Sequence, residues 1–224
     1  MRLTSLQQTV LRNRSRSFSV AAIGVLVLAT SLPAQAKRYP LDSTAGLRLH
    51  NVVAVPVVLQ GKKGLRITPS ADARSRLQSM TPNDQLFFPQ LATIDELEFA
   101  NGVIEAEIAG EPAPDAGESA RGYVGIAFRV QNDVTTYDAF YLRPTNGRAD
   151  DQERRNHAVQ YISHPDWPFF RLRREAPSKY ESYVDLMPGV WTKVKIEVRG
   201  ERARLYVHDQ EQPTLIVNDL KTGA

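Results

Sequence analysis

The stretch Lys193-Val194-Lys195-Ile196-Glu197-Val198-Arg199, followed after a turn by Ala203-Arg204-Leu205-Tyr206-Val207, decides the fold. Aliphatic and charged residues alternate in the first run, and small or aliphatic residues occupy every other position in the second. A period of two places alternate side chains on opposite faces of a strand. Arg199-Gly200-Glu201-Arg202 supplies a turn between the runs, so the sequence predicts an antiparallel hairpin with one buried face.

The same period recurs upstream. Residues 103–109 and 122–130 each predict a strand, whose inward side chains are Ile104, Ala106 and Ile108 in the first, and Val124, Ile126, Phe128 and Val130 in the second. Weaker patterns predict further strands at Val52–Leu59, Leu65–Thr68, Phe87–Ile94, Ala139–Arg143, Ala158–Ile162 and Leu215–Val217. Many strands with few helices are typical of sandwiches, so we expect an all-β, antiparallel sandwich.

Three details refine this expectation. Pro56 lies inside a predicted strand and therefore predicts an edge position or a break, because proline lacks the N–H that a central strand donates. Ala71–Gln78 is the one segment expected to form a short helix. The stretch from Pro144 to Gly189 is expected to be mainly loop, interrupted by one short strand.

Residues 1–36 have the pattern of an export signal. Arginines at positions 2, 12, 14 and 16 precede the apolar run 20–29, and Ala34-Gln35-Ala36 has the small-x-small pattern of a cleavage site. The apolar run is shorter than the roughly 20 residues that span a bilayer. We therefore expect a cleaved secretion signal peptide over 1–36, a periplasmic or secreted protein without stable membrane insertion, and a single β-sandwich domain over 37–224.

The composition excludes several classes of function. The first 36 residues hold four of the 28 basic residues and none of the 25 acidic ones, so residues 37–224 carry 24 basic against 25 acidic side chains and a formal charge of −1. This balance argues against nucleic acid as a partner. The chain has no cysteine, which excludes thiol nucleophiles, thiolate metal sites and disulfides.

The segment Met187-Pro188-Gly189-Val190-Trp191, together with the hairpin that follows it and the strand after Asn101-Gly102, resembles laminin G-like and concanavalin A-like jelly rolls. The resemblance covers roughly residues 97–217 and implies a jelly-roll β-sandwich. Such folds usually end in a glycine-rich closing strand, which the residues up to Ala224 do not contain. Either that strand lies outside this sequence or one sheet edge is left open.

Residues 141–173 are unusually rich in planar and polar side chains for a predicted loop. Aromatic rings can stack on the apolar face of a sugar, while Arg, Asn and Asp bind ring hydroxyls. We therefore predict a lectin-like, carbohydrate-binding site in this region, with Tyr161 and Trp167 as stacking platforms. A loop of self-satisfied ion pairs is the structural alternative. The candidate ligand-binding residues are Tyr141, Arg143, Asn146, Arg148, Arg155, His157, Tyr161, His164, Trp167 and Arg171.

Two other functions remain open. A glycan-active hydrolase would need two carboxylates roughly 5–10 Å apart, and the loop offers Asp150, Asp151, Glu153 and Asp166. A lyase would use His157 or Tyr161 as base, with Arg154 or Arg155 neutralising a uronate. Hydrolase and lyase together are the enzymatic alternative to carbohydrate binding. The other alternative is a protein–protein adhesion or structural module, as many laminin G-like domains are.

Cofactor signals are weak. The four histidines lack metal-ligand spacing, so no metal site is predicted. Calcium remains an open alternative, with Asp133, Asp138 or Asp150 as its ligands. The basic run Arg171-Leu172-Arg173-Arg174 favours an acidic glycan or an internal ion pair.

Overall fold

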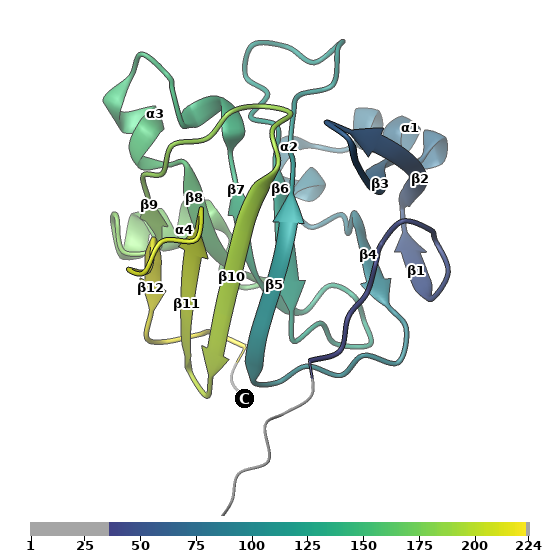
Figure 1. Ribbon diagram of the computed structural model, residues 1–224. Coiled ribbons are helices and arrows are strands. Elements are labelled where there is room, and N and C mark those ends of the chain that lie inside the picture. The colour runs from purple at the N-terminus through teal and green to yellow at the C-terminus, as the bar shows by residue number, and fades with distance from the viewer. Residues whose placement is uncertain (1–35, 223–224) are drawn as a thin grey trace, which may run out of the picture. The chain divides into compact units, whose positions relative to one another are not determined.

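A computed structural model describes residues 36–222. The chain divides into a segment that ends at Tyr39 and a compact unit that begins at Pro40, and the helices and strands of the described residues lie in the second unit (Figure 1). The predicted signal peptide, apart from its last residue, lies outside the described residues.

Two four-stranded antiparallel sheets form the body of the unit. One has the order β12 (Leu215–Val217), β11 (Arg202–Val207), β10 (Thr192–Arg199), β5 (Gly102–Ile108). The other has the order β6 (Val124–Phe128), β7 (Tyr137–Leu142), β8 (Val159–His164), β9 (Glu181–Ser182). Figure 1 shows β5, β10, β11 and β12 as one layer and β6 to β9 as a second layer behind it. The predicted all-β, antiparallel architecture and the β10–β11 hairpin are confirmed.

One apolar core contains side chains from both sheets. Ile196, Val198 and Leu205 come from β10 and β11, and Phe128 and Phe140 come from β6 and β7. Val194 and Ile196 of β10 face Ala106 and Ile104 of β5 in the register, as the alternation predicted. Burial of such side chains stabilises the fold by about 1.5–3 kcal/mol each.

Two smaller antiparallel sheets complete the unit. They pair β1 (Leu47–His50) with β4 (Leu91–Ile94), and β2 (Val52–Leu59) with β3 (Lys62–Pro69). β4 begins at Leu91, whereas the sequence predicted a strand that begins at Phe87. Pro56 lies in the two-stranded β2–β3 ladder, where both strands are edges, as predicted. Trp191 Nε1 donates to the Leu59 carbonyl at 2.9 Å, which attaches β2 to the start of β10.

The helices are short. α1 (Ala71–Ser79) confirms the predicted helix, and α2 (Pro82–Gln85) follows it. The prediction that 144–189 is mainly loop is wrong, because this stretch also contains η1 (Pro144–Asn146), α3 (Gln152–Asn156), α4 (Phe169–Glu175) and β9. The three helices span less than two turns each, and β9 has only two residues. Elements this short show no readable period in the sequence. None of the helices within residues 36–222 has the length and apolarity needed to cross a membrane.

Candidate functional site

The second sheet carries a buried polar cluster on its face away from the core. Phe140 and Tyr161 are opposite one another in the register and belong to the core, so their neighbours Tyr141 and Gln160, also opposite one another, point to the other face. β9 extends this face, because Glu181 is opposite Gln160. Helix α4 packs against β8, and Gln160 is wholly buried.

The Glu181 carboxylate is the centre of this cluster, with its side chain only 3% exposed. Arg143 Nη1 donates to Oε1 at 3.2 Å, and Arg173 donates through Nε to Oε2 at 2.9 Å and through Nη2 to Oε1. Two guanidinium groups therefore share one carboxylate. A buried carboxylate needs such partners, because its desolvation is otherwise costly.

Arg143 is buried and uses its donors within the protein. Nη1 also donates to the His157 carbonyl at 2.9 Å, while Nη2 donates to Tyr141 Oη at 2.9 Å and to Gln160 Oε1 at 3.2 Å. Burial raises the pKa of the Tyr141 hydroxyl, so it stays protonated at neutral pH. Arg143 consequently holds the cluster in place and has little capacity left for a ligand.

His157 joins the buried cluster to the surface. Its Nδ1 lies 3.0 Å from Glu181 Oε2, a close contact without linear hydrogen-bond geometry, and its Nε2 lies 4.0 Å from Glu153 Oε1. Burial lowers the pKa of His157 below 6.5. The charges of Glu181 and Glu153 raise this pKa, while those of Arg173 and Arg143 lower it, and the net shift is downward. The imidazole is therefore neutral at pH 7.

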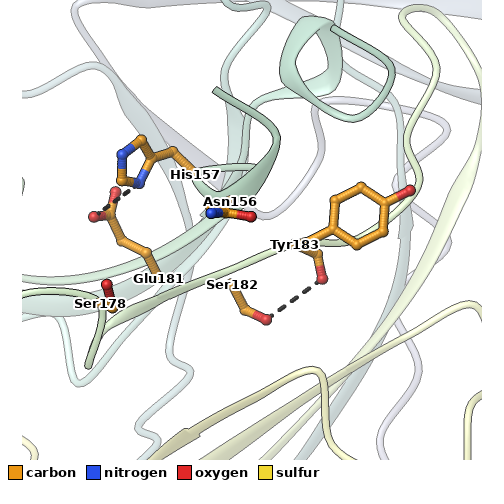
Figure 2. Close-up of a pocket in the computed structure, with 6 residues that line it drawn as sticks. All are labelled: Asn156, His157, Ser178, Glu181, Ser182 and Tyr183. Carbon is orange, nitrogen blue, oxygen red and sulfur yellow. Dashed lines mark hydrogen bonds and ion pairs between the residues drawn. The ribbon is translucent and has the colours of Figure 1, made fainter. Parts of the chain in front are cut away.

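A shallow depression opens beside His157. It has a volume of about 220 Å³ and is lined by Asn156, His157, Ser178, Glu181, Ser182 and Tyr183 (Figure 2). Figure 2 shows His157 and Glu181 turned toward one another, with Tyr183 at a distance from that pair. The lining thus combines an amide, an imidazole, a carboxylate, two hydroxyls and an aromatic ring.

Arg155 borders this depression through Tyr183. Its guanidinium lies 4.9 Å from the centre of the Tyr183 ring, and its Nη2 donates to Tyr183 Oη at 3.0 Å. Tyr183 remains 41% exposed. The ring is therefore held in one orientation while much of its surface faces water.

The structure brings together only part of the predicted site. Tyr141, Arg143 and His157 lie in or beside the Glu181 cluster, and Asn146 donates to the same His157 carbonyl that Arg143 contacts, at 3.2 Å. Arg155 lies at the edge of the depression. Of these residues His157 alone lines the depression, and Tyr141, Arg143 and Asn146 support it from beneath.

Tyr161 is wrongly predicted as a stacking platform. The residue is wholly buried between Phe140 and Tyr180, and its hydroxyl donates to Asp138 Oδ1 at 2.6 Å. Burial and the Asp138 charge raise its pKa, so it does not serve as the base of the lyase alternative either. A tyrosine in a strand can point to either face of the sheet, and Tyr161 points to the face that is buried in the core.

Trp167 and Arg171 form a second group. The Arg171 guanidinium lies 3.8 Å from the Trp167 ring centre and the Lys221 ammonium 4.8 Å from it. Arg171 also donates to Glu175 Oε1 at 2.9 Å and to the Asp166 carbonyl at 2.8 Å. The Trp167 ring that we predicted to stack on a sugar is thus occupied by cations of the protein itself.

His164 and Arg148 also have internal partners. His164 is buried against Tyr137, 5.0 Å between ring centres, and burial lowers its pKa. Arg148 forms two hydrogen bonds with Asp185, at 2.6 and 2.7 Å. For these side chains the self-satisfied alternative describes the structure better than the ligand-binding one.

Three of the acidic residues proposed for catalysis or calcium also have local structural roles. Asp151 caps α3 by accepting from the Arg154 N–H at 2.9 Å, and Asp133 accepts from Thr135 and Thr136. Asp138 is buried with Tyr161 and Thr222. Within residues 36–222 no three His, Asp or Glu side chains are grouped to hold a metal ion.

Sequence reasoning missed Glu181, Arg173, Asn156 and Tyr183. β9 is only two residues long, which is too short to show alternation, so no strand pattern pointed to Glu181. Arg173 was considered only within a basic run. No arginine lies between positions 175 and 198, so the sequence around Glu181 carried no local signal of its guanidinium partners.

Comparisons with protein-family models, with curated proteins and with solved structures found no match. The function therefore has to be argued from the chemistry of the depression and of the cluster beneath it.

Proposed function

We propose that the protein is an exported, lectin-like domain of the concanavalin A-like jelly-roll type, and that the depression beside His157 is its carbohydrate-binding site. The observation that carries the proposal is the lining itself, in which a part-exposed tyrosine and several hydrogen-bonding groups border one hollow. The two packed antiparallel sheets and the Pro188-Gly189-Val190-Trp191 turn before β10 support the jelly-roll assignment.

The lining fits the chemistry of a sugar ring. Sugar hydroxyls both donate and accept hydrogen bonds, as do the Asn156 amide and the hydroxyls of Ser178 and Ser182. The exposed face of Tyr183 can stack on the apolar C–H face of the ring. A volume of about 220 Å³ lies below the roughly 300–1,000 Å³ of sites for drug-sized ligands, so we expect the hollow to hold one sugar unit of a longer chain.

Glycan binding should depend on the depression and not on Trp167. On a broad glycan array probed with the chain from Lys37, with and without calcium, we expect Tyr183→Ala and Asn156→Ala to weaken binding about ten-fold each, since each removes a contact of about 1.4 kcal/mol. Ile216→Ala is the control, because Ile216 is 46% exposed, lies on β12 of the other sheet and does not line the hollow. Trp167→Ala should also leave binding unchanged.

Two outcomes would contradict the proposal. Loss of binding with Trp167→Ala but not with Tyr183→Ala would return the site to the region predicted from sequence. Indifference of the folded protein to every glycan would favour the protein–protein module.

The contact between His157 and Glu181 favours a second candidate, a glycan lyase. Glu181 near Nδ1 favours the tautomer whose lone pair is on Nε2, and Nε2 makes no hydrogen bond to any residue between 36 and 222. A neutral imidazole can then take a proton from a sugar ring carbon, while the C–O bond to the leaving sugar breaks and water protonates that oxygen. A two-carboxylate hydrolase is less suited to the site, because guanidinium groups already hold both Glu181 oxygens.

Lyase activity would appear as unsaturated, ultraviolet-absorbing products. We expect His157→Gln to abolish them, and Arg148→Gln, which alters an exposed ion pair, to leave the rate within about two-fold. Because the base must be neutral and burial lowers its pKa, the rate should fall only as the pH drops below 6.5. Glycan binding without any product would contradict the lyase candidate and support the lectin-like function.

A further inference from the structure

The charges around the depression do not balance. Three guanidinium groups contact its lining residues, since Arg143 and Arg173 hold Glu181 and Arg155 lies over Tyr183. Two carboxylates oppose them, Glu181 itself and Glu153, which lies 4.0 Å from His157. With His157 neutral, one positive charge remains in excess. The nearby pair Arg148 and Asp185 adds no net charge.

Two of the three arginines keep donors for a ligand. Arg155 has no carboxylate within 4.0 Å in the described part of the chain, and only its Nη2 makes a hydrogen bond. Arg173 uses Nε and Nη2 on Glu181, so its Nη1 is left without a protein acceptor among residues 36–222, and its side chain is 37% exposed. Arg143, by contrast, is buried and its two terminal nitrogens are engaged.

The position of these donors sets what the site can bind. Both arginines touch residues that line the hollow, Arg173 through Glu181 and Arg155 through Tyr183. A guanidinium group matches the planar geometry of a carboxylate and also binds sulfate well. A neutral sugar would satisfy the hydroxyl and amide groups but would leave the excess positive charge without a partner.

We propose that the ligand is an acidic saccharide, whose carboxylate or sulfate group is received by Arg155 and Arg173. This inference rests on the proposed glycan-binding function and adds the class of glycan. It agrees with a domain whose residues 37–224 carry a formal charge of −1, because the positive excess is local to the depression.

The test compares matched oligosaccharides by titration calorimetry with the folded chain from Lys37. The probes are a uronic acid oligosaccharide, its carboxyl-reduced neutral form, and the neutral form carrying sulfate. We expect each acidic probe to bind at least about ten-fold more tightly than the neutral one at low salt, and the difference to shrink as salt is added. The ratio of the two acidic probes tells which group the site prefers.

Arg155→Gln should weaken binding of the acidic probes about five- to ten-fold and that of the neutral probe by at most about two-fold, because the neutral probe loses only the contact that orients the Tyr183 ring. Arg148→Gln is the control, because it removes an equal charge from a guanidinium already paired with Asp185. Equal binding of acidic and neutral probes would overturn the inference and leave the proposed function standing. Failure of all three probes to bind would count against the proposed function itself.

Discussion

Replacing Glu181 by glutamine should lower the free energy of unfolding by about 3–5 kcal/mol. The change removes the one carboxylate that Arg143 and Arg173 share, while the Arg143 side chain is only 5% exposed and cannot recover its hydration. A buried ion pair adds little net stability when intact, but removing one partner leaves an uncompensated charge in a poorly solvated place. Equilibrium unfolding in urea, followed by circular dichroism, measures the difference.

Asp185→Asn is the matched control for this prediction. It also removes a carboxylate that binds an arginine through two hydrogen bonds, but the side chains of Arg148 and Asp185 are 59% and 51% exposed. Solvent screens such a pair, so the expected loss is at most about 1 kcal/mol. If both variants lose the same amount of stability, the buried cluster does not have the energetic role that we assign to it.

Gly147→Ala should destabilise the protein by about 3 kcal/mol through steric overlap. Gly147 follows η1, at a φ of −56° that alanine adopts freely, so backbone strain is not the cause. An added methyl group would lie 2.7 Å from both the Cβ and the carbonyl oxygen of Leu186, and still closer to its backbone nitrogen. Backbone atoms cannot rotate away, so the segment that includes Leu186 would have to shift.

Gly117→Ala is the control, because a methyl group there would meet nothing within 4 Å and the glycine has no left-handed backbone conformation. We expect its stability to stay within about 0.5 kcal/mol of the parent. Urea unfolding measures both variants. A Gly147→Ala variant as stable as Gly117→Ala would contradict the close packing of Gly147 against Leu186.

Most of the fold could be predicted because burial imposes a period that a single sequence displays. Ile196 and Val198 alternate with charged residues, and the structure buries that aliphatic face against the other sheet. The short elements of residues 144–189 were not predicted, since α3 has five residues and β9 has two. In such elements capping and tertiary contacts decide the conformation, and neither leaves a period.

The candidate site was predicted less well than the fold. Composition drew attention to a polar, aromatic-rich stretch, and His157 and Arg155 within it lie at the depression. Composition does not tell which side of the sheet a side chain faces, so buried Tyr161 was grouped with surface residues. It also does not tell which charges are already paired, as Arg148 and Arg171 are.

The sequence by itself determined an all-β protein with antiparallel hairpins, because alternation and turn residues are local properties that neighbouring positions express together. Only the tertiary structure decided that Glu181 binds Arg143, 38 positions before it, and that His157 lies between that carboxylate and the surface. Charge pairing across such separations depends on strand register and on the position of α4. Register and helix position follow from the packing of the whole domain. A charged side chain can favour one partner over another only after the folded chain has brought the possible partners close to it.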